Sequence, residues 1–143
     1  MPAIRFFEED ISYKLKDKKN VRRWVNETLV AEGFHLKEIT YIFCSDVYLL
    51  QINRQYLKHD TYTDIITFDN STVTGEITGD IFISIPRIIE NAATFKVSAT
   101  NELHRVMIHG VLHLLGYKDK TAASKKKMTE KEDYYLAKRS FIS

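Results

Sequence analysis

Two histidines one helical turn apart carry the most informative chemistry in this chain. His109 and His113 are the only polar side chains within Val106–Leu115. Because four residues turn an α-helix by about 400°, both imidazoles lie on the same face of a helix. Gly116 can end that helix in a left-handed conformation and bring Asp119 back toward the same face. Three donors that converge in this way suit a metal ion with an open coordination position.

The donor types indicate which metal is bound and what it does. Two imidazoles and one carboxylate suit zinc and leave a position for water, as in catalytic sites. A structural zinc site needs a fourth protein ligand, and the single cysteine, Cys44, excludes a cage of thiolates. We therefore predict one zinc ion per chain, held by His109, His113 and Asp119. The alternative is that both histidines are core residues bonded to backbone carbonyls.

A zinc ion held in this way favours hydrolysis of an ester, an amide or a phosphodiester. It lowers the pKa of its bound water toward ~7, and that water is the only catalytic group we assign. Zinc peptidases of the His-Glu-x-x-His type keep a general-base glutamate after the first histidine, where this chain has Gly110. A zincin-like metallopeptidase is therefore the less favoured alternative.

Glu102 is the candidate for orienting one of the imidazoles. It precedes His109 by two helical turns on the same stripe, so its carboxylate could accept a hydrogen bond from a histidine that binds the metal. The alternative is a first-turn glutamate that only interacts favourably with the helix dipole.

The elements that must position these residues alternate between strand and helix. Short segments rich in β-branched and aromatic residues predict strands at 3–7, 39–44, 64–68 and 79–84. Helices are predicted from their starting signals, which are Asn20, Ser45, Pro86 and Ser98, with a last helix after Asp119. The order β-α-β-α-β-β-α-α-α predicts an α+β fold, with a mixed β-sheet packed with helices in a single domain over residues 1–143. The helix with the histidines is nearly apolar all round, so we expect it to be buried and central.

Composition limits the class of protein further. The 143 residues are 44% hydrophobic, which is enough for one core. The chain has one cysteine, no signal-peptide pattern in Met1–Asp10 and no apolar stretch of about 20 residues. These features predict a cytoplasmic protein that does not contact a membrane. Two basic clusters are either solvated faces or the flanks of a groove for a polyanion; they are Lys14, Lys16, Lys18, Lys19, Arg22 and Arg23, and Lys118, Lys120, Lys125, Lys126 and Lys127.

Several motifs between about residues 50 and 135 match those of one family in order. They are Asn53 and Tyr56, then Thr63-Asp-Ile-Ile-Thr-Phe68, Gly79-Asp-Ile81, His109-Gly-Val-Leu-His113-Leu-Leu-Gly116-Tyr117, and finally Met128 and Glu132. On these residues the chain resembles the YbeY family of metal-dependent endoribonucleases. The resemblance implies an α+β fold with zinc in a cleft and cleavage of single-stranded RNA. It also implies a role in maturation of the 3′ end of small-subunit ribosomal RNA and in ribosome quality control. The implied partners are ribosomal RNA and the small ribosomal subunit, with no nucleotide cofactor.

Three positions depart from the family pattern. The family signature usually supplies a third histidine where this chain has Asp119, and it carries an arginine where this chain has Leu57. We therefore expect Arg54 and Lys58 to contact RNA in place of that arginine. Tyr62 stands at the family's proline, a change that we expect to be structural only. The alternative function is that of a non-catalytic, zinc-containing ribosome-assembly factor.

Overall fold

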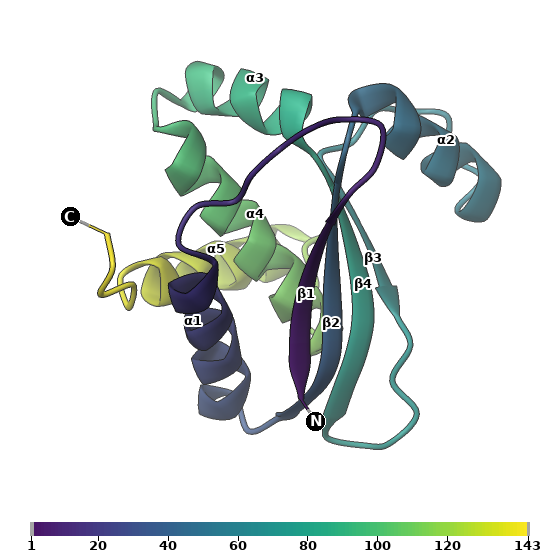
Figure 1. Cartoon of the computed structure of the whole chain (residues 1–143). Helices are drawn as coiled ribbons and strands as arrows, with labels where there is room; N and C mark the ends of the chain where they lie inside the picture. The colour runs from purple at the N-terminus through teal and green to yellow at the C-terminus, as the bar shows by residue number, and fades with distance from the viewer. Residues whose placement is uncertain (1, 143) are drawn as a thin grey trace.

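A computed structural model describes residues 2–142, with four strands and five helices in the predicted order (Figure 1). The elements are β1 (Ala3–Glu8), α1 (Lys18–Ala31), β2 (His35–Cys44), α2 (Asp46–Tyr56), β3 (Ile65–Asp69), β4 (Glu76–Ser84), α3 (Ile85–Phe95), α4 (Ala99–Leu114) and α5 (Ala122–Leu136). The predicted α+β class is confirmed. Within the described residues, no helix is both long enough and apolar enough to cross a membrane.

The sheet is mixed, as predicted. Its strand order is β1-β2-β4-β3, in which β1, β2 and β4 run parallel and β3 pairs antiparallel with β4. Both β2 and β4 begin earlier than predicted, at His35 and Glu76, and these two residues pair with each other. The first residues of both strands are largely polar, so a search for β-branched runs does not detect them.

Helices cover the two faces of the sheet unequally (Figure 1). The larger core packs α1 and α4 against one face, which contributes Ile39, Ile81 and Ile83, and α5 joins this core by packing on α4. A smaller cluster on the other face lies under α2 and is built on Leu49 and Ile66. The histidine helix therefore belongs to the larger of the two cores.

Helix α4 is buried and central, as predicted, since ten of its sixteen residues are buried. Ser98 caps its start, accepting a hydrogen bond from the backbone of Asn101 at 3.0 Å. At the other end Gly116 has φ 106°, and the N–H of Tyr117 donates to the carbonyl of Leu112 at 3.0 Å. This left-handed ending turns the chain back toward the helix.

The predicted cap of α1 was wrong. The helix begins at Lys18, three residues before the start that a cap at Asn20 would give, and Asp17 is the N-cap residue in place of Asn20. Asp17 has φ 58° and makes no side-chain cap, but its carbonyl accepts the N–H of Val21 at 2.9 Å. The sequence offers two cap-type residues three positions apart, and the backbone conformation decides between them.

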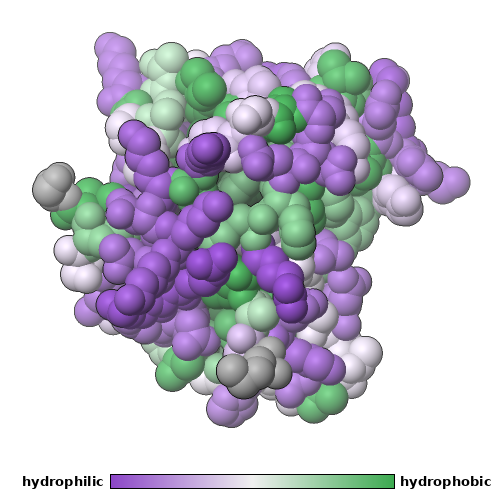
Figure 2. All heavy atoms as spheres, in the orientation of Figure 1, coloured by the Kyte–Doolittle hydropathy of each residue, from purple (hydrophilic) through white to green (hydrophobic). Residues whose placement is uncertain are grey.

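Figure 2 shows hydrophilic side chains gathered over the region of α1, where every member of the first basic cluster (Lys14 to Arg23) is exposed. The whole of this cluster is therefore accessible on the helix and on the segment before it.

Candidate metal centre

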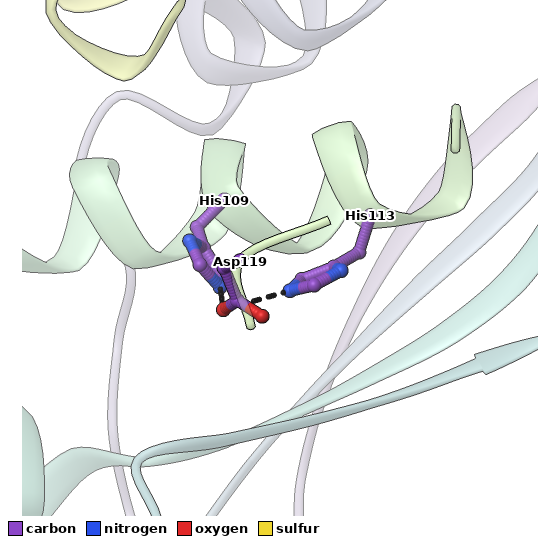
Figure 3. A group of neighbouring side chains, drawn as sticks. All are labelled: His109, His113 and Asp119. Atoms are coloured by element: carbon purple, nitrogen blue, oxygen red, sulfur yellow. Dashed lines mark hydrogen bonds and ion pairs between the residues drawn. The ribbon is translucent and has the colours of Figure 1, made fainter. Parts of the chain in front are cut away.

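Helix α4 and the loop after it bring the three predicted ligands together (Figure 3). The Oδ2 atom of Asp119 lies 3.3 Å from Nε2 of His109 and 3.2 Å from Nε2 of His113. Within residues 2–142, this is the one group of three or more such side chains whose donor atoms all lie within 4.8 Å of one another. The spacing of the histidines and the turn at Gly116 thus place three donors as the sequence predicts.

The spacing between donors fits a zinc-sized ion. Donors at ~2.0–2.2 Å from one ion lie about 3.3–3.6 Å apart at a tetrahedral angle, and the distances of 3.3 and 3.2 Å to Asp119 lie at the short end of that range. Imidazole nitrogen and carboxylate oxygen are also the donor types that zinc takes in open sites. These three residues could therefore hold a divalent metal and leave a position free.

Glu132 of α5 fixes the orientation of His109. Its Oε2 lies 2.6 Å from Nδ1 of His109, while its Oε1 accepts a hydrogen bond from Arg105 at 2.9 Å. Burial lowers the pKa of His109, but the hydrogen bond and charge of Glu132, followed by the charges of Asp119 and Asp64, raise it above its ordinary value. With Nδ1 donating to Glu132, the Nε2 lone pair is directed at the metal position.

We had expected Glu102 to orient His109, but the partner of His109 is Glu132. Glu102 lies in the first turn of α4 and is buried. Burial, together with the charges of Asp64 and Glu132, raises the pKa of Glu102 against the opposing charge of Arg105. Glu132 follows His109 by 23 residues on another helix, so helical spacing could not connect the two. The only earlier signal was its place among the family motifs.

A half-buried carboxylate anchors the loop that carries Asp119. Glu32, just after α1, accepts hydrogen bonds from the Tyr117 hydroxyl at 2.6 Å, from Lys131 at 3.1 Å and from the Tyr135 hydroxyl. Burial would raise the pKa of Glu32, but these three donors outweigh it and lower the pKa. Glu32 is therefore ionised and holds the loop two residues before the third candidate ligand.

The three candidate ligands line a cavity of about 440 Å³ between α4, β3 and the loop after α2. Its other walls come from Asn53, Leu57, His59, Thr61, Tyr62, Thr63, Asp64, Ile65, Ile66 and Thr67. Asp64 is the second carboxylate in this lining, and burial raises its pKa although the nearby charge of His109 opposes the shift. Apart from His109 and His113, His59 is the one basic side chain among the described residues of the lining. No spacing in the sequence indicates that Asp64 or His59 lines the cavity.

The predicted RNA contacts lie outside this cavity. Arg54, in the last turn of α2, pairs with the exposed Asp60, and neither Arg54 nor Lys58 is part of the lining. Leu57, at the position of the family arginine, does line the cavity. Tyr62, at the position of the family proline, lines it too and is 54% exposed.

Of the two basic clusters, only the second (Lys118 to Lys127) borders the candidate ligands. Lys118 and Lys120 line a small cavity that also contains His113 and Asp119. Among the described residues, no member of the first cluster lines either cavity. The two clusters therefore do not flank the candidate ligands as a pair.

Gly110 faces the sheet and not the cavity. A Cβ atom there would lie 2.9 Å from Cδ1 of Ile65 and 3.0 Å from Cγ2 of Ile81. The position that holds the general-base glutamate in His-Glu-x-x-His peptidases thus has no room for a side chain in this packing. This packing counts against peptidase chemistry.

Comparison with known proteins agrees with this geometry. The family model described as Endoribonuclease YbeY matches residues 4–140. The chain belongs to the YbeY family. The Endoribonuclease YbeY of Cytophaga hutchinsonii is 54% identical over 139 residues, 97% of each chain. That of Flavobacterium psychrophilum is 51% identical over 130 residues, 91% of this chain and 92% of the relative.

A solved structure is also similar to this member of the YbeY family. The solution structure of TM1509 from Thermotoga maritima superimposes with a TM-score of 0.64 at 29% sequence identity. The match covers 94% of this chain and 87% of the other. It agrees with the α+β arrangement that places the histidine helix against the sheet.

Proposed function

We propose that this chain is a zinc-dependent endoribonuclease that cleaves single-stranded RNA. The proposed process is maturation of the 3′ end of small-subunit ribosomal RNA, together with ribosome quality control. Ribosomal RNA and the small ribosomal subunit are then its partners, and the cytoplasm is its location. The observation that carries the proposal is the convergence of His109, His113 and Asp119 on one wall of a cavity, in a chain of the YbeY family.

Different residues of the cavity have different roles in phosphodiester hydrolysis. His109, His113 and Asp119 would hold zinc, which when bound supplies a Lewis acid for the phosphoryl oxygen and an acidified water. Asp64 lines the same cavity, and its raised pKa lets its carboxylate accept a proton there and hold it. His59, which also lines the cavity, can donate a hydrogen bond to a phosphate oxygen.

The test is cleavage of labelled single-stranded RNA and of the matching duplex, with zinc present and after chelation. We expect cleavage of the single strand only, lost on chelation and lost in His113→Ala. His35→Ala is the matched control, because His35 is exposed at the start of β2 and lies outside the cavity. Persistent cleavage by His113→Ala would contradict the assignment of the site.

A second candidate, a non-catalytic ribosome-assembly factor, is favoured by one observation. Among the described residues, the cavity lining holds neither an arginine nor a lysine, and Leu57 stands where the family usually has an arginine. Binding to the small ribosomal subunit without RNA cleavage, unchanged in Asp119→Asn, would support this candidate over the endoribonuclease.

A further inference from the structure

Tyr62 presents an aromatic surface to the cavity that holds the candidate ligands. It lies in the loop between α2 and β3 and is 54% exposed. Leu57, another exposed apolar side chain, lines the same cavity. A large apolar surface left uncovered beside a polar site is informative because burying it would be favourable.

An arginine backs the ring of Tyr62. Cζ of Arg87 lies 5.4 Å from the ring centroid, within the range of a cation–π contact. Asp46 holds this guanidinium in place, with Nη2 to Oδ2 at 2.6 Å and Nε to Oδ1 at 3.3 Å. Asp46 in turn accepts a hydrogen bond from Ser84 at 3.1 Å. One side of the ring therefore rests on a fixed group, while more than half of the residue stays accessible.

Asn53 holds the loop that carries Tyr62. Its side chain is buried, and its Nδ2 donates to the carbonyl of Thr61, the residue before Tyr62, at 2.8 Å. Its own carbonyl accepts the backbone N–H groups of Leu57 and His59, each at 3.1 Å. The tyrosine is thus held from both sides, by its loop and by the arginine behind it. Such a surface loses little entropy when a ligand stacks on it.

We propose that Tyr62 is the stacking platform for an unpaired nucleobase of the RNA substrate, next to the cleaved linkage. A nucleobase is planar and uncharged at its faces, and aromatic side chains stack on it whatever its identity. In a duplex both faces of a base are covered by its neighbours, so the platform accepts only a base splayed out of a helix. The inference rests on the proposed function and adds a base subsite, which selects single strands without selecting sequence.

The experiment compares wild-type protein with Tyr62→Ala and Tyr62→Phe in the zinc-loaded full chain. Binding of a labelled single-stranded RNA with hydrolysis-resistant phosphorothioate linkages is measured by fluorescence anisotropy, alongside cleavage of the unmodified RNA. Tyr134→Ala is the matched control, since Tyr134 is 53% exposed, has Lys138 Nζ 4.9 Å from its ring centroid and lies outside the cavity. A second set of RNAs carries one abasic position at successive sites.

We expect Tyr62→Ala to weaken binding by about 5-fold to 150-fold, the contribution of one stacked base, while Tyr62→Phe and Tyr134→Ala bind like wild type. One abasic position should cost the wild type a similar factor and cost Tyr62→Ala almost nothing, because the stacked pair is already lost. If wild type binds and cleaves RNA and Tyr62→Ala binds it equally tightly, or if every abasic loss is the same in both proteins, the inference is wrong and the proposed function stands. If the wild type neither binds nor cleaves RNA, both fail.

Discussion

Removing Glu132 tests whether the orientation of His109 matters for metal binding. Two variants separate charge from hydrogen bonding. Glu132→Gln keeps an oxygen that can accept from Nδ1 of His109 but loses the negative charge, whereas Glu132→Ala loses both. Arg105 keeps a second acidic partner in either variant, because it also pairs with Asp133 at 2.6 Å. The change is therefore confined mainly to the histidine.

The magnitude follows from the burial and length of this bond. Loss of a group that orients a metal-binding histidine costs about 10-fold to 100-fold in metal affinity, or about 1.4–2.7 kcal/mol. Glu132 is only 6% exposed and its oxygen lies 2.6 Å from Nδ1, so we place Glu132→Ala at the upper end and Glu132→Gln at the lower end. Because Glu132 also raises the pKa of His109, protons compete with the metal in the wild type. The difference from the variants should therefore widen as the pH rises.

Zinc affinity is measured by competition with a chromophoric chelator, and circular dichroism checks that each variant is folded. Glu130→Gln is the control, since Glu130 is exposed on the same helix and has the same charge. Equal zinc affinity in wild type and Glu132→Ala, with both folded, would refute the reasoning. So would an equal loss in Glu130→Gln.

Three further predictions concern the fold around the site. His104 is 2% exposed, and burial, followed by the charge of Arg139, lowers its pKa to about 4. The neutral His104 imidazole therefore contributes fully to the stability of the fold above its ordinary pKa of 6.5, and this contribution is lost as the pH falls through 4. Urea unfolding should show a loss of about 3 kcal/mol over this range that is missing in His104→Gln. Gly110→Glu should lower the free energy of unfolding by about 3 kcal/mol or more, because a charged side chain is forced against the sheet. Although this variant restores the His-Glu-x-x-His pattern of the zinc peptidases, it should not hydrolyse casein. Glu32→Gln should lower the melting temperature at neutral pH but much less in acid, because the lowered pKa of Glu32 confers stability above its ordinary value of 4.5 that is lost as the pH falls.

Local patterns in the sequence predict most of the fold and the three candidate ligands. The apolar helix, the four-residue step between His109 and His113 and the turn at Gly116 are features of one short segment. Their geometry follows from backbone stereochemistry, which is the same in every helix. The order of strands and helices could be predicted for the same reason, since each element carries its own periodicity and caps.

The remaining features of the site depend on packing between distant segments. Glu132 meets His109 only because α5 folds back along α4, and Tyr62 faces the cavity only because Asn53 holds its loop. Neither contact has a spacing that a sequence could reveal. The expectation for Glu102 failed for this reason, since helical register describes one helix and the acceptor lies on another.

The most direct test of the central claim is the metal content of the purified chain. Elemental analysis compares wild type with Asp119→Ala, with Lys118→Ala as a control in the same loop that leaves all three candidate ligands in place. We expect close to one zinc ion per chain in wild type and in Lys118→Ala, and little in Asp119→Ala. Zinc retained in full by a folded Asp119→Ala, or no zinc in the wild type after growth with zinc, would contradict the claim that these three residues hold a metal.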